Sequence, residues 1–399
     1  MAARANLRAN RPGFATAVDP LVIVGTGLAG YTLAREWRRL VPDAPLVMLS
    51  RDGGELYSKP MISAALASGK GAADLATASA PQMAAQLGAE VRTRCPVSAI
   101  DTLRHSARVD GADVPYSRLV LALGADPIRL PLTGDGAADV LAVNDLEGYG
   151  RFRTALEGHR RVLILGAGLI GCEFANDLAA AGYSVAIADP ASWPLARLLP
   201  QAVGTALRDR LAAIGVRWHL GTGVESVERA GDLLRVRLDD GESVEAEVAL
   251  SAVGLRPRTT VAAEAGLTVN RGIVVGRDLA TTAPSVFALG DCAEVCGLIL
   301  PYVLPIMHAA RALARTLAGE PTPVTYPAMP VVVKTPAWPT VVAPAPAGSE
   351  GDWAETDVTS GGARALYRGK DGRLLGFALS GEAVAEKNRY GRELPAVLG

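Results

Sequence analysis

The chain is poor in residues that bind metals or relay electrons as thiols. It has four cysteines among 399 residues, and no two of them form a C-x-x-C pair. That spacing favours neither a disulfide framework nor a zinc site. The four histidines also lack metal-ligand spacing, so no bound metal is expected. Four thiols without a secretory signal favour a reducing cytoplasm.

Strong net charge and long apolar runs are absent as well. The formal net charge is -1, which argues against a general nucleic-acid binder. The longest apolar run, residues 295–307, is interrupted by Pro301 and Pro305 and is too short to span a bilayer. We expect that run to be buried near the functional site. Apolar residues make up 49% of the chain, which is enough for two or three globular domains.

The chain does contain one internal repeat. Residues 21–30 read LVIVGTGLAG and residues 162–171 read VLILGAGLIG. Each copy is an apolar run typical of a buried parallel strand, a G-x-G-x-x-G motif, and an amphipathic stretch typical of a helix. One such motif can be an ordinary glycine turn. Two in this context predict two dinucleotide-binding units.

Each glycine has its own role in this motif. The first makes the tight turn, the second lets the backbone approach a pyrophosphate, and the third lets helix and strand pack closely. The pyrophosphate would lie on the helix N-terminus, where free N–H groups and the helix dipole attract anions. The candidate residues are Gly25, Thr26, Gly27, Ala29 and Gly30 in the first unit, and Gly166, Gly168, Leu169, Ile170 and Gly171 in the second.

The acid at the end of the next strand distinguishes the two units. In the second unit that strand ends at Asp189, eighteen residues after Gly171. A carboxylate there accepts a hydrogen bond from a ribose 2′-hydroxyl and repels a 2′-phosphate, which favours NADH. In the first unit the strand ends at Ser50, so the usual acid is missing and Ser50 or Asp52 would replace it.

A third segment, SVFALGDCAE at residues 285–294, ends a short apolar strand at Gly290 and Asp291. Alone, this Gly-Asp pair could be a simple turn. Combined with the first glycine motif, it resembles the FAD-dependent pyridine-nucleotide oxidoreductases, and the resemblance implies that Asp291 binds the flavin ribityl hydroxyls. The segments LVLALGAD and SAVGLRP resemble the strands that leave the FAD and NAD domains of that family, which adds Gly124 to the FAD site and Gly254 to the NAD site.

The resemblance implies an α/β fold with two Rossmann-like, doubly wound domains, the NAD domain inserted in the FAD domain. The expected division is a flexible tail over 1–18, an FAD domain over 19–125 and 249–325, an NAD domain over 126–248, and a C-terminal α+β interface domain over 326–399. In the last part, short apolar segments at 331–333, 340–342, 365–367 and 374–379 predict strands, followed by a helix from Gly381 onward.

Disulfide reductases of this family carry a cysteine pair beside the flavin, and that pair is missing here. The corresponding segment reads YSKPMIS at residues 57–63, and the expected NAD domain holds only Cys172. Cys292 and Cys296 form a C-x-x-x-C, which leaves open structural thiols or a redox pair. Without a thiol relay, the flavin would pass electrons directly to an acceptor.

The chain as a whole resembles the rubredoxin reductases. The likeness is carried by YSKP, GAGLIGCEFANDLA, SAVGLRPRT, ALGDCAEV and, in the C-terminal domain, VKTPA. It implies FAD and NADH as cofactors and rubredoxin, a small acidic iron protein, as the acceptor, for example in an alkane hydroxylase system. Two other functions stay open: reduction of a [2Fe–2S] ferredoxin, and a flavin-binding redox sensor without turnover.

Three charged residues are candidates for catalysis. Lys59 precedes Pro60, a residue suited to the first turn of a helix, and its cation would stabilise reduced flavin. The resemblance implies that Lys59 and Glu173, which is expected in the first turn of the second unit's helix, pair across the flavin and that Glu173 meets the nicotinamide carboxamide. Lys334 is the only charge between Glu320 and Glu350, and we expect it to reach the flavin. Each residue also has a simpler interpretation. Lys59 would be a solvated surface lysine, Glu173 would only complement the helix dipole, and Lys334 would be a solvated lysine on an edge strand.

Two basic runs in the C-terminal domain have two interpretations. They are Arg364, Arg368, Lys370 and Arg373, and then Lys387, Arg389 and Arg392. Such runs are usually solvated faces, but they are also candidates for docking an acidic partner.

The Asp189 assignment gives the first testable prediction. Asp189→Ala should narrow the preference for NADH over NADPH, because it removes both the ribose acceptor and the repulsion of a 2′-phosphate. The ratio of kcat/KM for the two donors measures this. A wild-type protein that prefers NADPH would show that the assignment is wrong.

Overall fold

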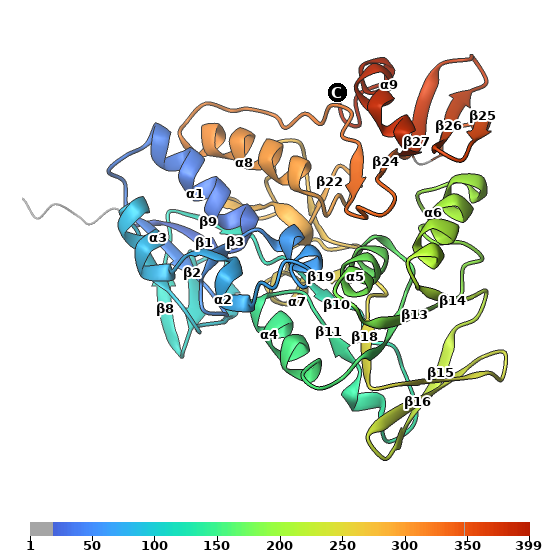
Figure 1. Ribbon diagram of the computed structural model, residues 1–399. Coiled ribbons are helices and arrows are strands. Elements are labelled where there is room, and N and C mark those ends of the chain that lie inside the picture. Colours follow the sequence, from blue (N-terminus) through green and yellow to red (C-terminus); the bar gives the residue numbers. More distant parts are fainter. Residues whose placement is uncertain (1–18, 347) are drawn as a thin grey trace, which may run out of the picture.

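Three five-stranded sheets organise the part of the chain that the structure describes (Figure 1). The structure is a computed structural model that describes residues 19–346 and 348–399. The tail expected over residues 1–18 lies outside the described residues. No helix in the described part is long and apolar enough to cross a membrane.

The first sheet is wholly parallel, in the order β21-β9-β1-β2-β5. Its strands are β1 (Leu21–Val24), β2 (Leu46–Leu49), β5 (Glu90–Arg92), β9 (Arg118–Leu121) and β21 (Val286–Ala288). Its helices are α1 (Leu28–Leu40), α3 (Ala80–Leu87) and α8 (Val303–Leu317), and α1 packs against α8. β21, the last strand of this sheet, lies far along the chain from β1, and the second unit lies between β9 and β21 in the sequence.

Smaller elements surround this sheet. They are β3 (Leu56–Tyr57), η1 (Lys59–Ala64), α2 (Ala72–Leu75), β4 (Ala76–Ala78), β6 (Val97–Asp101), β7 (Ser106–Val109), β8 (Ala112–Pro115), α7 (Thr260–Glu264), β20 (Ile273–Val275), η3 (Gly290–Cys292) and β22 (Ala293–Val295). The apolar run at 295–307 is only partly buried, contrary to expectation. Val303 and Leu304 are 39% and 49% exposed at the start of α8.

The second sheet is also parallel, in the order β11-β18-β12-β13-β14. Its strands are β11 (Leu141–Ala142), β12 (Arg161–Leu165), β13 (Ser184–Asp189), β14 (Arg217–Leu220) and β18 (Val248–Ser251), with helices α4 (Leu146–Ala155), α5 (Leu169–Ala180) and α6 (Gln201–Ala213). A hairpin sheet of β15 (Val224–Ala230), β16 (Leu233–Leu238) and β17 (Ser243–Ala246) follows, and η2 (Ala137–Asp139) lies against it.

Two short strands connect the first two sheets. β10 (Ala125–Pro127) and β19 (Leu255–Pro257) pair antiparallel where the chain leaves and re-enters the first unit. Because β18 belongs to the second sheet, that unit extends to Ser251, three residues past the boundary expected at 248.

The third sheet is antiparallel, in the order β23-β24-β27-β26-β25. Its strands are β23 (Val331–Val333), β24 (Thr340–Ala343), β25 (Gly351–Val358), β26 (Gly362–Gly369) and β27 (Leu374–Gly381), followed by η4 (Glu382–Glu386) and α9 (Lys387–Glu393). We did not expect β25, because its sequence GDWAETDV has acids where apolar residues would mark a strand. It is an edge strand, where charged side chains remain in water.

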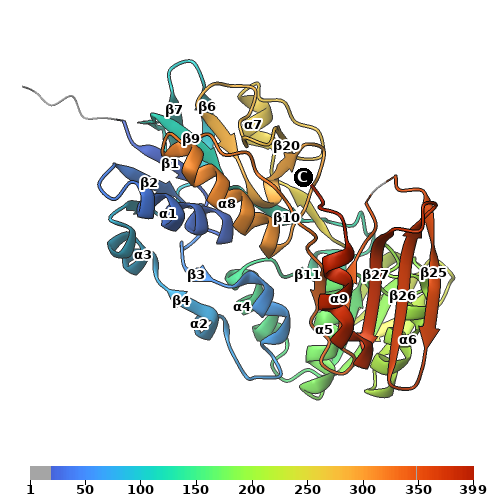
Figure 2. The ribbon, with the colours of Figure 1, turned by 90° about the horizontal axis from the view of Figure 1, so that it is seen from above.

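The third sheet shares a hydrophobic core with the second unit (Figure 2). Val331, Val333 and Trp338 belong to the same buried cluster as Phe174 of α5 and Leu207 of α6. The guanidinium of Arg210 on α6 also lies over the Trp338 ring, 4.4 Å from its centre. The C-terminal domain therefore packs directly on the helices of the second unit.

Candidate active site

Both glycine motifs form the same strand-to-helix turn. Gly25 and Gly166 adopt φ values of +119° and +107°, a region that side chains disfavour. A Cβ at Gly30 would overlap the carbonyl oxygen of Gly25, and one at Gly171 would overlap that of Gly166. The first and third glycines are therefore required by the fold itself.

The middle glycines differ, since a Cβ at Gly27 or Gly168 would meet no atom within 4 Å. These two residues are the N-caps of α1 and α5, and neither helix has a side-chain cap or an acid in its first turn. Open space beside uncapped N–H groups fits a bound pyrophosphate in both units. Ala29 and Ile170 lie in these same first turns.

Ser50 and Asp52 belong to one hydrogen-bonded group with Thr26. Ser50 Oγ donates to Asp52 Oδ1 at 2.5 Å, so Thr26 Oγ1, also 2.5 Å from Ser50 Oγ, must be the donor of that second bond. The N–H of Gly54 donates to the same Oδ1 at 3.0 Å. No partner is found for Asp52 Oδ2 within the described residues, so this oxygen can accept a ribose hydroxyl.

Asp189 holds the second glycine turn in place. Its Oδ2 accepts from the N–H of Ala167 at 2.6 Å, and its Oδ1 accepts from the N–H of Ala191 at 2.7 Å. Each carboxylate oxygen has two lone pairs, so Asp189 can accept a ribose hydroxyl in addition. Gly254, with φ +117°, follows β18 in the same unit.

Lys59 and Asp291 meet at the edge of the first sheet. Lys59 Nζ on η1 lies 3.8 Å from Asp291 Oδ2 on η3, too far for a hydrogen bond. A Cβ at Gly290 would contact Ala29, which places η3 against the start of α1. Burial lowers the pKa of Lys59, and Asp291 partly offsets this. Gly124 lies close by, in contact with Arg258, whose guanidinium holds Asp126 at 2.6 Å.

The partner of Glu173 is Lys334 rather than Lys59. Lys334 Nζ donates to Glu173 Oε2 at 2.5 Å, and the N–H of Lys334 donates to Glu173 Oε1 at 3.0 Å. The carboxylate is only 1% exposed. Glu173 lies just beyond the first turn of α5, contrary to expectation, so dipole complementarity alone explains it poorly.

The same lysine also contacts η1. Lys334 Nζ donates to Ser63 Oγ at 2.7 Å and to the carbonyl oxygen of Pro60, and Ser63 Oγ donates to Glu173 Oε2 at 2.5 Å. Lys334, Glu173 and Pro60, all expected at the site, are thus brought together from three different parts of the chain.

Ser63 of η1 and two residues of α5, Asn176 and Asp177, were not predicted from the sequence as site residues. Asp177 accepts from the N–H groups of Leu66 and Ala67, just after η1, and Asn176 accepts from the N–H of Ala337. Burial raises the pKa of Asp177. The available signal was the set of three polar residues on an otherwise apolar helix. Ser63 carried no signal of its own.

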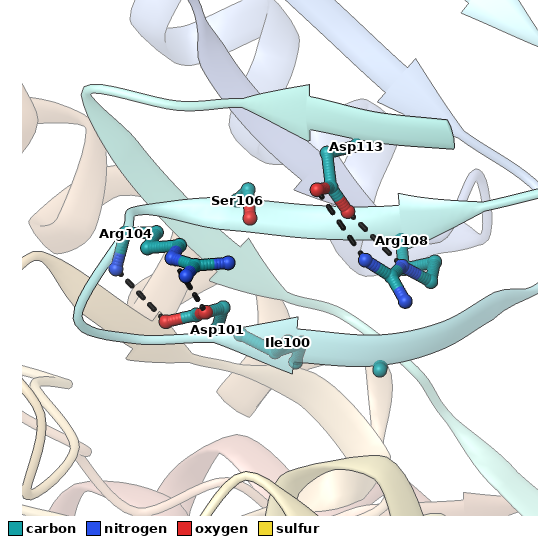
Figure 3. Close-up of a pocket in the computed structure, with 7 residues that line it drawn as sticks. Ile100, Asp101, Arg104, Ser106, Arg108 and Asp113 are labelled. Atoms are coloured by element: carbon teal, nitrogen blue, oxygen red, sulfur yellow. Dashed lines mark hydrogen bonds and ion pairs between the residues drawn. The ribbon is translucent and has the colours of Figure 1, made fainter. Parts of the chain in front are cut away.

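The groove in Figure 3 lies away from this region. It encloses about 180 Å³ on β6 and β7, and its charges are paired, Arg104 with Asp101 and Arg108 with Asp113. The cysteines form no disulfide; Cys292 is buried, whereas Cys296 is exposed. No group of histidine, cysteine and acidic side chains in the described part could hold a metal ion.

This fold and this site define a two-dinucleotide oxidoreductase with an additional C-terminal domain. Residues 19–315 match the pyridine nucleotide-disulphide oxidoreductase family, and residues 323–394 match the rubredoxin binding C-terminal domain. The chain belongs to the pyridine nucleotide-disulphide oxidoreductase family and, within it, to the rubredoxin-NAD(+) reductases.

Individual relatives agree with this family. A rubredoxin-NAD(+) reductase of Alcanivorax borkumensis is 50% identical over 96% of this chain and 100% of its own length. One of Acinetobacter baylyi is 44% identical over 93% of this chain and 96% of its own. A solved ferredoxin reductase of Rhodopseudomonas palustris has a TM-score of 0.85 and 25% identity, covering 94% of this chain and 93% of its own.

The contrast between the glycines gives the second prediction. Gly171→Ala should destabilise the fold by about 1–3 kcal/mol, because the methyl group overlaps backbone. Gly168→Ala should destabilise the fold less, by about 0.5–1 kcal/mol because alanine is a poorer N-cap, yet raise the KM for NADH by about tenfold or more, equivalent to ~1.4 kcal/mol. Thermal unfolding and steady-state kinetics measure the two effects. A Gly168→Ala variant with wild-type KM would argue against a pyrophosphate at this turn.

Proposed function

We propose that this protein oxidises NADH and passes the electrons through FAD to rubredoxin. The observation that carries the proposal is that Lys334, from the domain matching a rubredoxin-binding family, forms an ion pair with the buried carboxylate of Glu173 on the helix of the second dinucleotide unit. The acceptor-binding domain is therefore part of the redox site itself. The names of the relatives from Alcanivorax and Acinetobacter support the same function.

We assign the cofactors as follows. The first sheet and its surroundings, residues 19–125 and 249–325, would bind FAD through Gly25, Thr26, Gly27, Ala29, Gly30, Ser50, Asp52, Lys59, Pro60, Gly124, Asp291 and Lys334. The second unit, residues 126–248 with the rest of β18, would bind NADH through Gly166, Gly168, Leu169, Ile170, Gly171, Glu173, Asp189 and Gly254. Residues 326–399 would form the rubredoxin interface. The turns, the free oxygen of Asp52 and the uncapped helices support this assignment.

Bound FAD supplies the chemistry: it accepts hydride from NADH and releases the electrons one at a time. The protein provides charge and position. Lys59 would donate to the flavin, because no hydrogen bond is found for its ammonium in the described part. Cys292 takes no part in this scheme as a thiolate, since burial raises the pKa of its thiol to about 11.

Docking of rubredoxin would use α9 more than β26. Arg364, Lys370 and Arg389 are already paired with Glu386, Glu350 and Glu386. Lys387 and Arg392 on α9 are exposed and have no ion pair among the described residues. Unpaired cations attract an acidic partner more effectively than paired ones.

We also propose that the protein works in the cytoplasm. None of its four cysteines is in a disulfide, as expected in a compartment that keeps thiols reduced.

The third prediction concerns the acceptor. Purified protein should be yellow from one non-covalent FAD per chain. It should oxidise NADH rapidly with rubredoxin and much more slowly with a [2Fe–2S] ferredoxin or a dithiol compound. Rates of NADH oxidation, measured side by side at equal acceptor concentration, decide between these three acceptors. Faster turnover with ferredoxin would transfer the assignment to that acceptor, and no turnover with any would favour a redox sensor.

The fourth prediction concerns Lys59. Lys59→Ala should slow flavin reduction by NADH about 10- to 100-fold, because a hydrogen bond with a charged group contributes ~1.5–3 kcal/mol. Stopped-flow bleaching without an acceptor isolates this step. Lys70→Ala, an exposed lysine of the same unit, is the control and should behave as wild type. Equal rates for both variants would remove Lys59 from the site.

A further inference from the structure

The ammonium group of Lys334 uses all of its protons in hydrogen bonds within the protein. It carries three N–H donors. All three have acceptors within the protein: Glu173 Oε2, Ser63 Oγ and the carbonyl oxygen of Pro60. Lys334 therefore acts on its surroundings through its charge, unlike Lys59, which is free to donate.

Ser63 links the two charges of this pair. Its hydroxyl group accepts a hydrogen bond from Lys334 and donates its single proton to Glu173. Ser63 is 3% exposed and Glu173 is 1% exposed, so water cannot easily replace this hydroxyl. A buried charge that loses a hydrogen-bond partner is strongly disfavoured.

We propose that Ser63 is a positioning residue of the electron-transfer site, whose hydroxyl holds the Lys334 ammonium and the Glu173 carboxylate in fixed positions beside the flavin. This inference rests on the proposed function. Donation from Ser63 stabilises the carboxylate, and acceptance by Ser63 stabilises the ammonium. Without this hydroxyl, each of the two charged groups has one hydrogen-bond partner fewer to fix its position.

Other charged groups face the pair from each neighbouring element. Asp177, on the same helix as Glu173, interacts electrostatically with Lys334, and Lys59 extends from η1 toward Asp291. Cys172 is fully buried next to Glu173, and burial raises the pKa of its thiol so far that it stays neutral. None of these groups hydrogen-bonds to the Lys334 ammonium, so they cannot take the place of Ser63.

The expected effect on the flavin has a definite sign. A cation held beside the isoalloxazine favours reduced, anionic flavin. In Ser63→Ala holoenzyme the Lys334 ammonium loses one of its three acceptors, so the flavin midpoint potential should be lower than in the wild type. Spectroscopic redox titration of the FAD-loaded protein across pH 6 to 9 measures this without any turnover.

Three variants accompany Ser63→Ala. Ser63→Thr keeps the hydroxyl and should restore the wild-type potential. Ser68→Ala removes an exposed hydroxyl that only donates to the carbonyl oxygen of Ala65, so it should have no effect. Lys334→Met keeps the apolar stem but removes the charge, and should lower the potential at all these pH values. If Ser63→Ala does not retain FAD, Ser63→Cys takes its place in the titration.

The possible outcomes separate the role of Ser63 from the proposed reduction of rubredoxin. If Ser63→Ala has the wild-type potential while Lys334→Met lowers it, the role of Ser63 is wrong. If neither variant alters the potential, the placement of Lys334 and Glu173 beside the flavin is wrong as well. Reduction of rubredoxin by the wild-type protein is measured separately, and its absence would contradict the proposed function alone.

Discussion

The ion pair between the buried Glu173 carboxylate and the half-buried Lys334 ammonium is the constraint on which the arrangement of this protein depends. Burying a carboxylate is costly unless its oxygens find charged or hydrogen-bonding partners. Here the carboxylate comes from α5, the ammonium follows β23, and η1 supplies Ser63 and the carbonyl oxygen of Pro60. Shifting α5 or β23 would leave the buried carboxylate without its ammonium partner.

The same constraint explains why the C-terminal domain is fixed to the second unit. The helix that follows the second glycine turn also carries Glu173, Asn176 and Asp177 on its buried side. Through them it contacts both the segment after η1 and the loop after β23. One helix thus connects the second glycine turn with the C-terminal domain. The two lysines differ accordingly, since Lys59 can donate a hydrogen bond whereas Lys334 contributes only charge.

Interactions within short segments could be predicted from the sequence. The two glycine motifs and the acid at Asp189 depend on a strand, a turn and a helix that follow one another directly, so their spacing is fixed by local geometry. The Gly290-Asp291 strand end was recognisable for the same reason. Where local patterning was weak, prediction failed: β25 lacks apolar alternation because an edge strand does not need it.

The sequence by itself determined the two dinucleotide units and the chemistry of each loop, because those features depend on residues within about one turn of each other. Only the tertiary structure decided which charges meet. Glu173 lies 161 residues from Lys334 and 110 from Ser63, and no spacing rule relates such positions. Their partnership follows from packing the third sheet on α5 and α6, and that packing is set by the shared core rather than by any local motif.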